Sequence, residues 1–276
     1  MFKKVGILGS GIVGRVLADG FLKHGYEVMM GTRDPSKLSE WLKTPIFREQ
    51  EVDAISEDMG PVFIKGESAK KRIERARERR KKYEADLRKA LAAQSSELNP
   101  EQKRVPLEKK VGTFAETASF AECIVLSVKG NDAVSALELA GAANLKGKIV
   151  IDTTNPIADG APVNGVLPFY TSLDKSQMED LQSRFPAVRF VKAFSCIGNA
   201  FMVNPSFPEG KPTMFICGND DKAKQQVSQL LEQFGHDPAD MGAVEAARAI
   251  EPLCMLWCIP GITRNQWNHA FRLIRS

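Results

Sequence analysis

The sequence predicts a Rossmann-type α/β protein, in which a doubly wound, mostly parallel sheet is covered by helices on both faces. Short apolar runs alternate with amphipathic stretches along most of the 276 residues, a pattern typical of parallel sheets buried between helices. The first apolar run, residues 5–8, leads into a glycine-rich turn and then into a helical pattern. Strand, glycine turn and helix in this order are the context in which such a turn binds a dinucleotide.

The glycine-rich turn spans residues 9–14 and has three glycines in G-x-G-x-x-G spacing. Gly9 allows the tight turn, Gly11 lets the backbone approach a pyrophosphate, and Gly14 lets the helix pack closely on the strand. The diphosphate is expected on the free N–H groups at the helix N-terminus, where the macrodipole favours negative charge. The predicted contacts of this turn are Gly9, Ser10, Gly11, Ile12, Val13 and Gly14.

The end of the second strand, residues 26–33, indicates which dinucleotide is bound. An NAD enzyme would place Asp or Glu there to accept hydrogen bonds from the adenine ribose, but this chain has Thr32 and Arg33. A hydroxyl and a guanidinium bind a 2′-phosphate with charge-assisted bonds, whereas a carboxylate would repel it. Lys37 follows four residues after Arg33 and adds a third contact. We therefore predict NADP(H) rather than NAD(H); the alternative is that Arg33 and Lys37 are ordinary solvated charges.

Composition limits the class of protein. A hydrophobic content of 43% and a charged content of 26% are typical of soluble globular proteins. No apolar run approaches the roughly 20 residues of a membrane helix, and the first strand begins almost at the N-terminus, so we expect no leader and a cytoplasmic location. The five cysteines lack C-x-x-C spacing and the three histidines are far apart. The sequence therefore predicts no metal site.

Residues 46–110 form a different kind of sequence. They hold 17 Lys and Arg and 13 Asp and Glu, and the resulting +4 equals the net charge of the whole chain. Residues 68–92 are strongly helix-forming with a narrow apolar stripe, and residues 70–82 are rich in basic side chains. A solvated helix with internal ion pairs is the favoured interpretation. Binding of nucleic acid or of an acidic partner through residues 65–92 is the alternative.

The remaining elements complete the α/β pattern. Strands are expected at residues 111–114, 123–128, 149–153, 190–194 and 213–218, and helices at residues 133–143, 177–185 and 222–234. We predict that residues 1–45 and 111–242 form the NADP-binding Rossmann domain, that residues 46–110 are a charged helical insertion, and that residues 243–276 are a helical C-terminal segment.

Ligands of such sheets bind beyond the carboxyl ends of the strands. Residues that follow the fourth, fifth and sixth strands are therefore expected at the nicotinamide end. Val128, Lys129 and Pro156 are predicted to contact the cofactor. Asn155 and Asn199 are candidates to orient the carboxamide or the acceptor, with turn formation as the alternative role. Ser195 and Cys196 lie in the same region without a predicted role.

Five motifs extend the pattern: residues 6–14, 31–37, 126–130, 152–156 and 191–200. With the runs 212–219 and 250–253, they resemble the F420-dependent NADP oxidoreductase family, in its bacterial branch of predicted dinucleotide-binding enzymes. The resemblance covers residues 1–45 and 111–276. It implies hydride transfer between NADPH and a deazaflavin, and a 2′-phosphate site at Thr32, Arg33 and Lys37. The insertion departs from the family, and the membrane helices of the related STEAP metalloreductases are not found in this chain.

The sequence does not identify the hydride acceptor. Deazaflavin F420, a flavin, a ferric chelate and a cyclic imine are all compatible with the resemblance, because fold alone does not decide the substrate. A different class of function is a non-catalytic NADP(H)-binding module, whose nucleotide state would bias an interaction made by the insertion or by residues 253–271. The latter segment is apolar and is interpreted as either a core helix or the face of a homodimer.

Overall fold

The structure, a computed structural model, describes residues 2–46 and 106–275. Nearly all of the predicted insertion, including residues 65–92, lies outside the described residues. Six strands form one sheet in the order β3-β2-β1-β4-β5-β6, and every neighbouring pair is parallel. The strands are β1 (Lys4–Leu8), β2 (Glu27–Gly31), β3 (Lys110–Gly112), β4 (Cys123–Leu126), β5 (Ile149–Asp152) and β6 (Arg189–Lys192). The predicted Rossmann-type fold class is confirmed.

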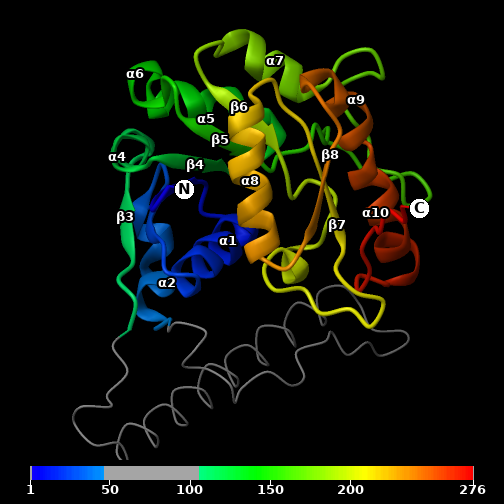
Figure 1. Cartoon of the computed structure of the whole chain (residues 1–276), viewed down its shortest axis with the longest axis horizontal. Helices are drawn as coiled ribbons and strands as arrows, with labels where there is room; N and C mark the ends of the chain where they lie inside the picture. The colour runs from blue at the N-terminus through cyan, green and yellow to red at the C-terminus, as the bar shows by residue number, and fades with distance from the viewer. Residues whose placement is uncertain (1, 47–105, 276) are drawn as a thin grey trace, which may run out of the picture. The chain divides into compact units, whose positions relative to one another are not determined.

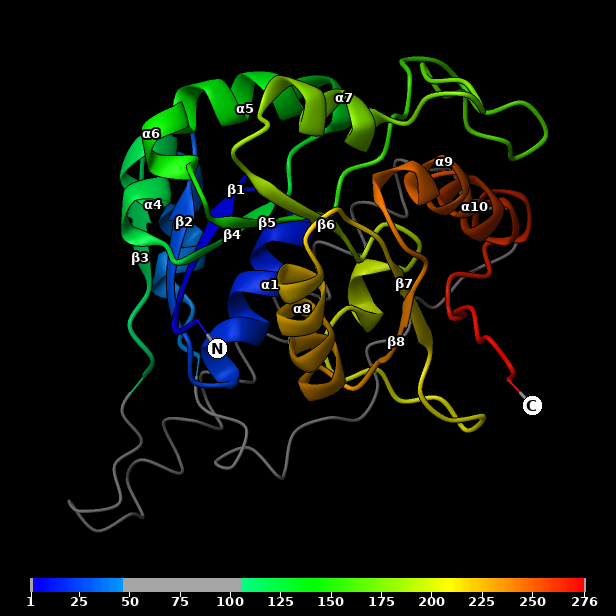
Figure 2. The ribbon, with the colours of Figure 1, turned by 45° about the horizontal axis from the view of Figure 1, so that its top comes forward.

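Helices cover both faces of this sheet (Figures 1 and 2). One face is covered by α1 (Ile12–Lys23) and α8 (Asp221–Gln233); the other is covered by α4 (Phe114–Phe120), α5 (Ala133–Ala140), α6 (Ala142–Leu145) and α7 (Gln177–Arg184). Strands β4 and β5 are buried along their whole length. Burial on both faces explains why these strands are continuous apolar runs in the sequence.

Between β2 and β3 the chain forms the 3₁₀ helix η1 (Pro35–Leu38) and the short helix α2 (Ser39–Lys43). The indole of Trp41 donates to Asp19 Oδ1 at 2.6 Å. Lys109 Nζ donates to the carbonyl oxygens of Trp41 and Thr44, both at 2.6 Å, and lies 4.4 Å from the centre of the Trp41 ring. The chain before residue 47 is thus tied to the chain after residue 105.

The structure differs from the predicted elements in three places. Strand β7 (Thr213–Ile216) pairs with β8 (Asp237–Asp240) in a separate parallel sheet, and β8 was not predicted because Asp-Pro-Ala-Asp contains no apolar run. The helix expected at residues 133–143 is interrupted at Gly141, whose φ is +87°. The strand expected at residues 111–114 ends at Gly112, because Thr113 and Glu116 form a capping box that begins α4.

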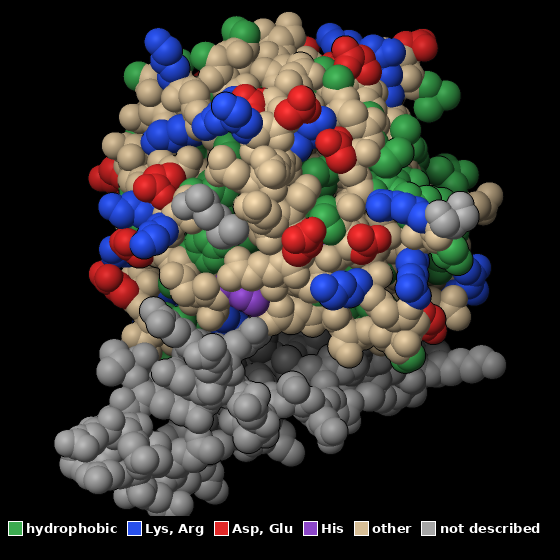
Figure 3. Space-filling view, viewed as in Figure 1, with side chains coloured by type: hydrophobic (Ala, Val, Ile, Leu, Met, Phe, Trp, Pro, Cys, Tyr) green, Lys and Arg blue, Asp and Glu red, His purple; other side chains and the backbone are tan. Residues whose placement is uncertain are grey.

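The C-terminal part contains η6 (Val244–Ala246), α9 (Ala247–Ile250) and α10 (Leu253–Arg264), after which residues 265–275 form no helix. Figure 3 shows hydrophobic side chains gathered around α9 and α10 at the right-hand edge of the molecule. Leu256 and Ile262 of α10 are 54% and 37% exposed. A homodimer face here stays a prediction. In the described ranges, no helix combines the length and the apolar composition needed to cross a membrane.

Candidate functional site

The glycine turn joins β1 to α1 and is closely packed against the end of β4. Gly9 has a φ of +129°, and a Cβ there would lie 2.5 Å from the Ser127 carbonyl oxygen. A Cβ at Gly14 would lie 2.4 Å from the Gly9 carbonyl oxygen and 2.8 Å from Ser127 Oγ. No side chain fits at either position without displacing the backbone. These contacts explain the two outer glycines, and they show that Ser127, directly after β4, packs against the turn.

Gly11 has a different environment, because a Cβ at this position would meet no protein atom within 4 Å. It is the N-cap of α1 and makes no side-chain cap hydrogen bond, so the first N–H groups of the helix face this open side. Ile12 begins the helix 55% exposed, and Val13 is half-buried. A bare backbone in front of a helix N-terminus is the cradle that a dinucleotide diphosphate requires, so the residues present fit the cofactor.

The end of β2 is a tight polar turn. Thr32 is buried, and its hydroxyl accepts from the Asp34 backbone N–H at 3.2 Å and lies 3.4 Å from Ser10 Oγ. The Asp34 carboxylate accepts from the hydroxyl and the backbone N–H of Ser36 at 2.6 and 3.1 Å, and these bonds lower the pKa of Asp34. The carboxylate nearest the predicted ribose position is therefore engaged within its own turn.

Three cationic residues belong to the glycine turn and the end of β2. Arg15 Nε donates to the Ser10 carbonyl at 3.0 Å, and its Nη2 donates to the Lys37 carbonyl at 3.1 Å. Arg15 thereby fixes the glycine turn against η1. Arg33 is 66% exposed and lies 3.8 Å from Asp132, so its guanidinium is held only loosely. Arg33 and Lys37 are both exposed, and their contact with a 2′-phosphate stays a prediction.

The predicted nicotinamide contacts follow β4 and β5. Val128 is half-buried, Lys129 is exposed and precedes the 3₁₀ helix η4 (Gly130–Asp132), and Pro156 is buried. Asn155 Nδ2 donates to the Ser195 carbonyl at 2.8 Å, so the end of β5 is joined to the segment after β6. Asn199 begins the 3₁₀ helix η5 (Asn199–Phe201) and is half-buried. Their roles toward a ligand stay predictions.

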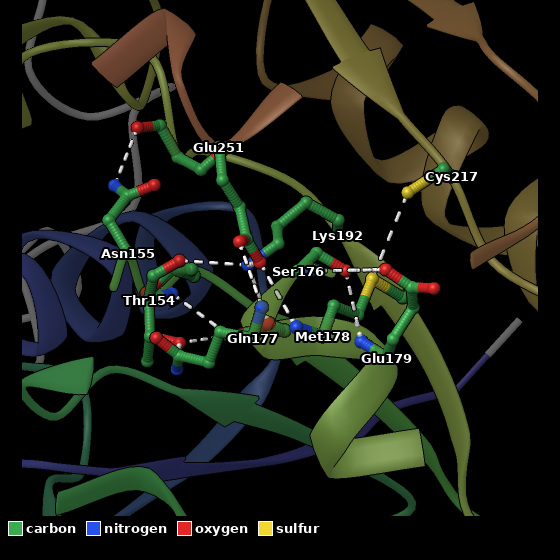
Figure 4. A network of polar contacts seen from close by, with 12 residues as sticks. Thr154, Asn155, Ser176, Gln177, Met178, Glu179, Lys192, Cys217 and Glu251 are labelled. Carbon is green, nitrogen blue, oxygen red and sulfur yellow. Dashed lines mark hydrogen bonds and ion pairs between the residues drawn. The ribbon is translucent and has the colours of Figure 1, made fainter. Parts of the chain in front are cut away.

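A buried ion cluster lies directly behind these strand ends (Figure 4). Lys192 is fully buried, and its Nζ lies 2.7 Å from Asp152 Oδ2 and 3.0 Å from Glu251 Oε1. Glu251 also accepts from the backbone N–H groups of Gln177 and Met178, both at 3.0 Å. The positive end of α7 thus balances the second carboxylate. The cluster fixes the ends of β5 and β6 relative to α7.

Polar side chains extend the cluster toward a cavity. Gln177 Nε2 donates to Thr154 Oγ1 at 2.6 Å, and Tyr170 donates to Gln177 Oε1 at 2.6 Å. Beside them lies a cavity of about 540 Å³, whose wall includes Gly130, Val134, Tyr170, Gln177 and Leu181. Its volume is in the usual range for a small-molecule pocket. Burial raises the pKa of Tyr170 to about 12, so its hydroxyl is a hydrogen-bond donor at neutral pH.

Cys196 and Cys217 are buried and are not activated as nucleophiles. Burial raises the pKa of both Cys196 and Cys217 to about 12, so both are protonated thiols at neutral pH. All five cysteines are free. Among the residues described, no group of three or more His, Cys, Asp or Glu is arranged to hold a metal ion.

Comparison with known proteins identifies the family. The family model described as NADP oxidoreductase, coenzyme F420-dependent, matches residues 4–64 and 58–156, which together exceed half of the chain. The chain belongs to this family. Membership supports an NADP-dependent oxidoreductase, in agreement with the glycine turn and the cationic end of β2. It does not determine the acceptor.

Two curated relatives are metalloreductases. STEAP3 of Rattus norvegicus is 34% identical over 153 residues, which are 54% of this chain and 29% of the relative. STEAP2 of Homo sapiens is 31% identical over 109 residues, which are 40% of this chain and 20% of the relative. The chain therefore matches less than a third of the length of these relatives.

Solved structures share the whole fold. A candidate F420-dependent NADP reductase from Arthrobacter sp. FB24 is 28% identical, with a TM-score of 0.70 and 100% of both chains covered. A reductive aminase from Aspergillus terreus, solved in complex with NADPH, has a TM-score of 0.53 at 15% identity, and covers 96% of this chain and 64% of its own. The second likeness shows the fold alone.

Several residues of the site were missed from the sequence, among them Arg15, Lys192, Gln177 and Glu251. Arg15 sits in a helix and binds two carbonyl oxygens, so no carboxylate partner marks it. Lys192 carried a signal, since a lysine within the apolar run 190–194 is rarely buried unless it is paired. Its partners are 40 and 59 positions away along the chain, and only the fold brings them together.

Proposed function

We propose that this chain transfers a hydride between NADPH and a small conjugated acceptor, such as deazaflavin F420 or a flavin. The observation that carries the proposal is the junction of the glycine turn with the end of β2. Thr32 lies 3.4 Å from Ser10, Arg15 bonds the carbonyl oxygens of Ser10 and Lys37, and the exposed cations Arg33 and Lys37 follow Thr32 in the chain. Family membership supports the same reaction class.

The chain's own residues divide the binding task. The N–H groups at the start of α1 bind the diphosphate, because the helix end presents unsatisfied donors and a partial positive charge. The exposed Arg33 guanidinium binds the 2′-phosphate, with Lys37 adding charge, while Arg15 holds the two segments in register. Bound NADPH supplies the hydride, and the chemistry is otherwise that of the two rings.

The acceptor is proposed to bind at the cavity of about 540 Å³ beside Tyr170 and Gln177. This region offers hydrogen-bond donors and apolar walls, whereas the described residues show no nucleophile activated by a neighbouring base. Hydride transfer between stacked rings needs close positioning more than a proton donor, so such a site is sufficient. Deazaflavin and flavin both present the extended planar ring that a half-apolar cavity accepts.

Arg33→Ala tests the cofactor assignment. Loss of a charge-assisted hydrogen bond to phosphate is expected to weaken NADPH about 10- to 100-fold, while NADH, which has no 2′-phosphate, changes by less than about twofold. The measurement is the Kd of each dinucleotide by fluorescence titration. Lys43→Ala is the matched control, because Lys43 is an equally exposed cation on α2 whose partner is Glu40. An equal loss for both dinucleotides in Arg33→Ala would show that Arg33 does not contact the 2′-phosphate.

Turnover tests the reaction. NADPH oxidation is followed at 340 nm with F420, FMN, a ferric chelate and a cyclic imine as separate acceptors, and NADH is run in parallel. Turnover with one acceptor and a preference for NADPH are expected. Tight NADPH binding without oxidation by any of the four would favour the non-catalytic module instead.

A further inference from the structure

Two buried polar atoms at the ends of β5 and β6 make no hydrogen bond within the described residues: Asn155 Oδ1 and Ser195 Oγ. The two residues are joined, since Asn155 Nδ2 donates to the Ser195 carbonyl at 2.8 Å. That bond fixes the orientation of the amide, because only the NH₂ group can face a carbonyl oxygen. Asn155 is therefore left with an unpaired oxygen, an acceptor, and the residue that it bonds, Ser195, is left with an unpaired hydroxyl, a donor and acceptor.

The backbone at this place is strained as well. Phe194 has a φ of +59° although it is a large aromatic residue, and such a conformation costs on the order of 1–3 kcal/mol. Its ring is held between Phe234 and His236, at centroid distances of 6.4 and 5.8 Å. The turn sets the direction of Ser195, which is only 4% exposed. Strain and unpaired buried atoms together are typical of a position shaped for a ligand.

The position in the sheet indicates which part of the cofactor reaches the pair. In the order β3-β2-β1-β4-β5-β6, the ends of β5 and β6 lie three and four strands from β2, or roughly 14 and 19 Å at the usual strand spacing. A dinucleotide whose 2′-phosphate lies at the end of β2 and whose diphosphate lies at the end of β1 extends toward β4. Its nicotinamide end therefore arrives beside Asn155 and Ser195.

We infer that Asn155 and Ser195 together bind the carboxamide of the nicotinamide and so set the orientation of its ring. A primary carboxamide offers an N–H donor for Asn155 Oδ1 and a carbonyl acceptor for the Ser195 hydroxyl, which matches the pair in type and number. The Lys192 cluster acts as the support, because it fixes the strand ends on which both residues stand. This inference rests on the proposed function, in that it takes NADP(H) as the ligand.

The test compares two dinucleotides that differ only at the carboxamide. In 3-acetylpyridine adenine dinucleotide phosphate, a methyl group replaces the NH₂ group of NADP⁺, so the donor to Asn155 is lost. The native chain is expected to bind NADP⁺ about 10-fold more tightly than this analogue. In Asn155→Ala the ratio of the two Kd values should fall to within about twofold of one, because no hydrogen-bond acceptor at position 155 then distinguishes the two ligands. Ser195→Ala should weaken both ligands by a similar factor, since both retain the carbonyl.

Controls separate this effect from a general loss of structure. The fragment 2′,5′-ADP has no nicotinamide, and its Kd should change by less than about twofold in every variant. Thr117→Val is the matched variant, because Thr117 Oγ1 is also buried and unpaired but lies on α4; it should retain the native ratio. If Ser195→Ala fails to fold, Ser195→Cys is measured instead, since the thiol keeps the volume but donates weakly.

The outcomes distinguish this inference from the proposed function. A native chain that binds neither NADP⁺ nor 2′,5′-ADP would refute the proposed function, and the inference with it. A chain that binds both, but whose NADP⁺-to-analogue ratio is near one or survives Asn155→Ala unchanged, would overturn the inference alone. A hydride acceptor such as a flavin has an imide edge with the same N–H and C=O groups, and it could bind Asn155 and Ser195 as well. No hydride acceptor is present in these titrations. Loss of the NADP⁺-to-analogue affinity ratio in Asn155→Ala would therefore assign Asn155 and Ser195 to the dinucleotide.

Discussion

A methyl group at Gly11 would meet no protein atom within 4 Å, whereas one at Gly14 would lie 2.4 Å from the Gly9 carbonyl oxygen. The two positions are three residues apart in the same motif, yet Gly11 is exposed and Gly14 is packed against the protein. The motif predicts these separate roles because each depends on a local turn. Arg15 was not predicted, because its role depends on where η1 packs against the glycine turn.

Gly11→Ala and Gly14→Ala should therefore fail in different ways. Gly11 has a φ of −71°, which alanine adopts freely, so the expected loss of stability is only that of alanine at an N-cap, about 1 kcal/mol, while NADPH binding weakens about 10-fold or more through contact with the phosphates. Gly14→Ala should cost about 1–3 kcal/mol through overpacking and lower the Tm further. Thermal unfolding and NADPH titration of both variants provide the check. A larger Tm loss in Gly11→Ala than in Gly14→Ala, or an unchanged Tm in Gly14→Ala, would contradict this division.

At the scale of elements, α7 is positioned from both sides by residues of the C-terminal part. Glu251 accepts from the first N–H groups of α7, and Glu179 within α7 accepts from Arg248 of α9 through both carboxylate oxygens at 3.1 and 3.0 Å. The sequence predicts α7 itself from its periodicity, and its Ser176–Glu179 capping box is a local signal. The partners, Arg248 in α9 and Glu251 directly after it, are about 70 residues away, so no local pattern contains them.

The pair between Glu179 and Arg248 should make stability depend on pH. Hydrogen bonds from Arg248 lower the pKa of Glu179 from 4.5 to about 2. Because the folded pKa lies below the unfolded value, the contribution is complete above pH 4.5 and is lost as the pH falls toward 2. Arg248 is 42% exposed, so screening limits the contribution to about 1 kcal/mol.

Arg248→Ala should therefore be less stable than the native chain by about 1 kcal/mol at pH 7, and the difference should shrink toward pH 2. Urea unfolding at a series of pH values gives both curves. Lys43→Ala, which removes an exposed cation paired with an exposed Glu40, should show no such convergence. A stability difference for Arg248→Ala that is constant from pH 7 to pH 2.5 would mean that the ion pair does not carry the effect.

At the scale of the whole molecule, the six-stranded sheet follows largely from the sequence, because its central strands β1, β4 and β5 are separate, mostly apolar runs. The sequence does not predict which segment pairs with β7, the strand that lies outside this sheet. The run 213–218 predicts a strand, but its pairing with β8 depends on a segment, Asp237–Asp240, that has no strand pattern. The Asp152–Lys192–Glu251 cluster could not be predicted from the sequence for the same reason, since its members come from three separate parts of the chain.

The two ends of the described chain that flank the predicted insertion are held together by hydrogen bonds. Lys109 binds the carbonyl oxygens of Trp41 and Thr44, and Trp41 binds Asp19 of α1. These contacts close the path from β2 to β3 without any residue between 47 and 105. Lengthening or shortening a loop whose ends are held costs little, because closure entropy changes slowly with length.

A chain in which residues 47–105 are replaced by a short Gly-Ser linker should therefore fold and bind NADPH with a Kd within about twofold of the native value, since loop length contributes little to stability. The Tm and NADPH titration measure this. Lys109→Ala in the shortened chain is the informative companion, because it removes the bonds that hold both ends, and its Tm should fall further. A loss of NADPH affinity above about 10-fold, or 1.4 kcal/mol, in the shortened chain would show that the insertion contributes to the site. Salt-sensitive affinity for nucleic acid in the full chain, absent from the shortened one, would assign the basic run 65–92 a binding role of its own.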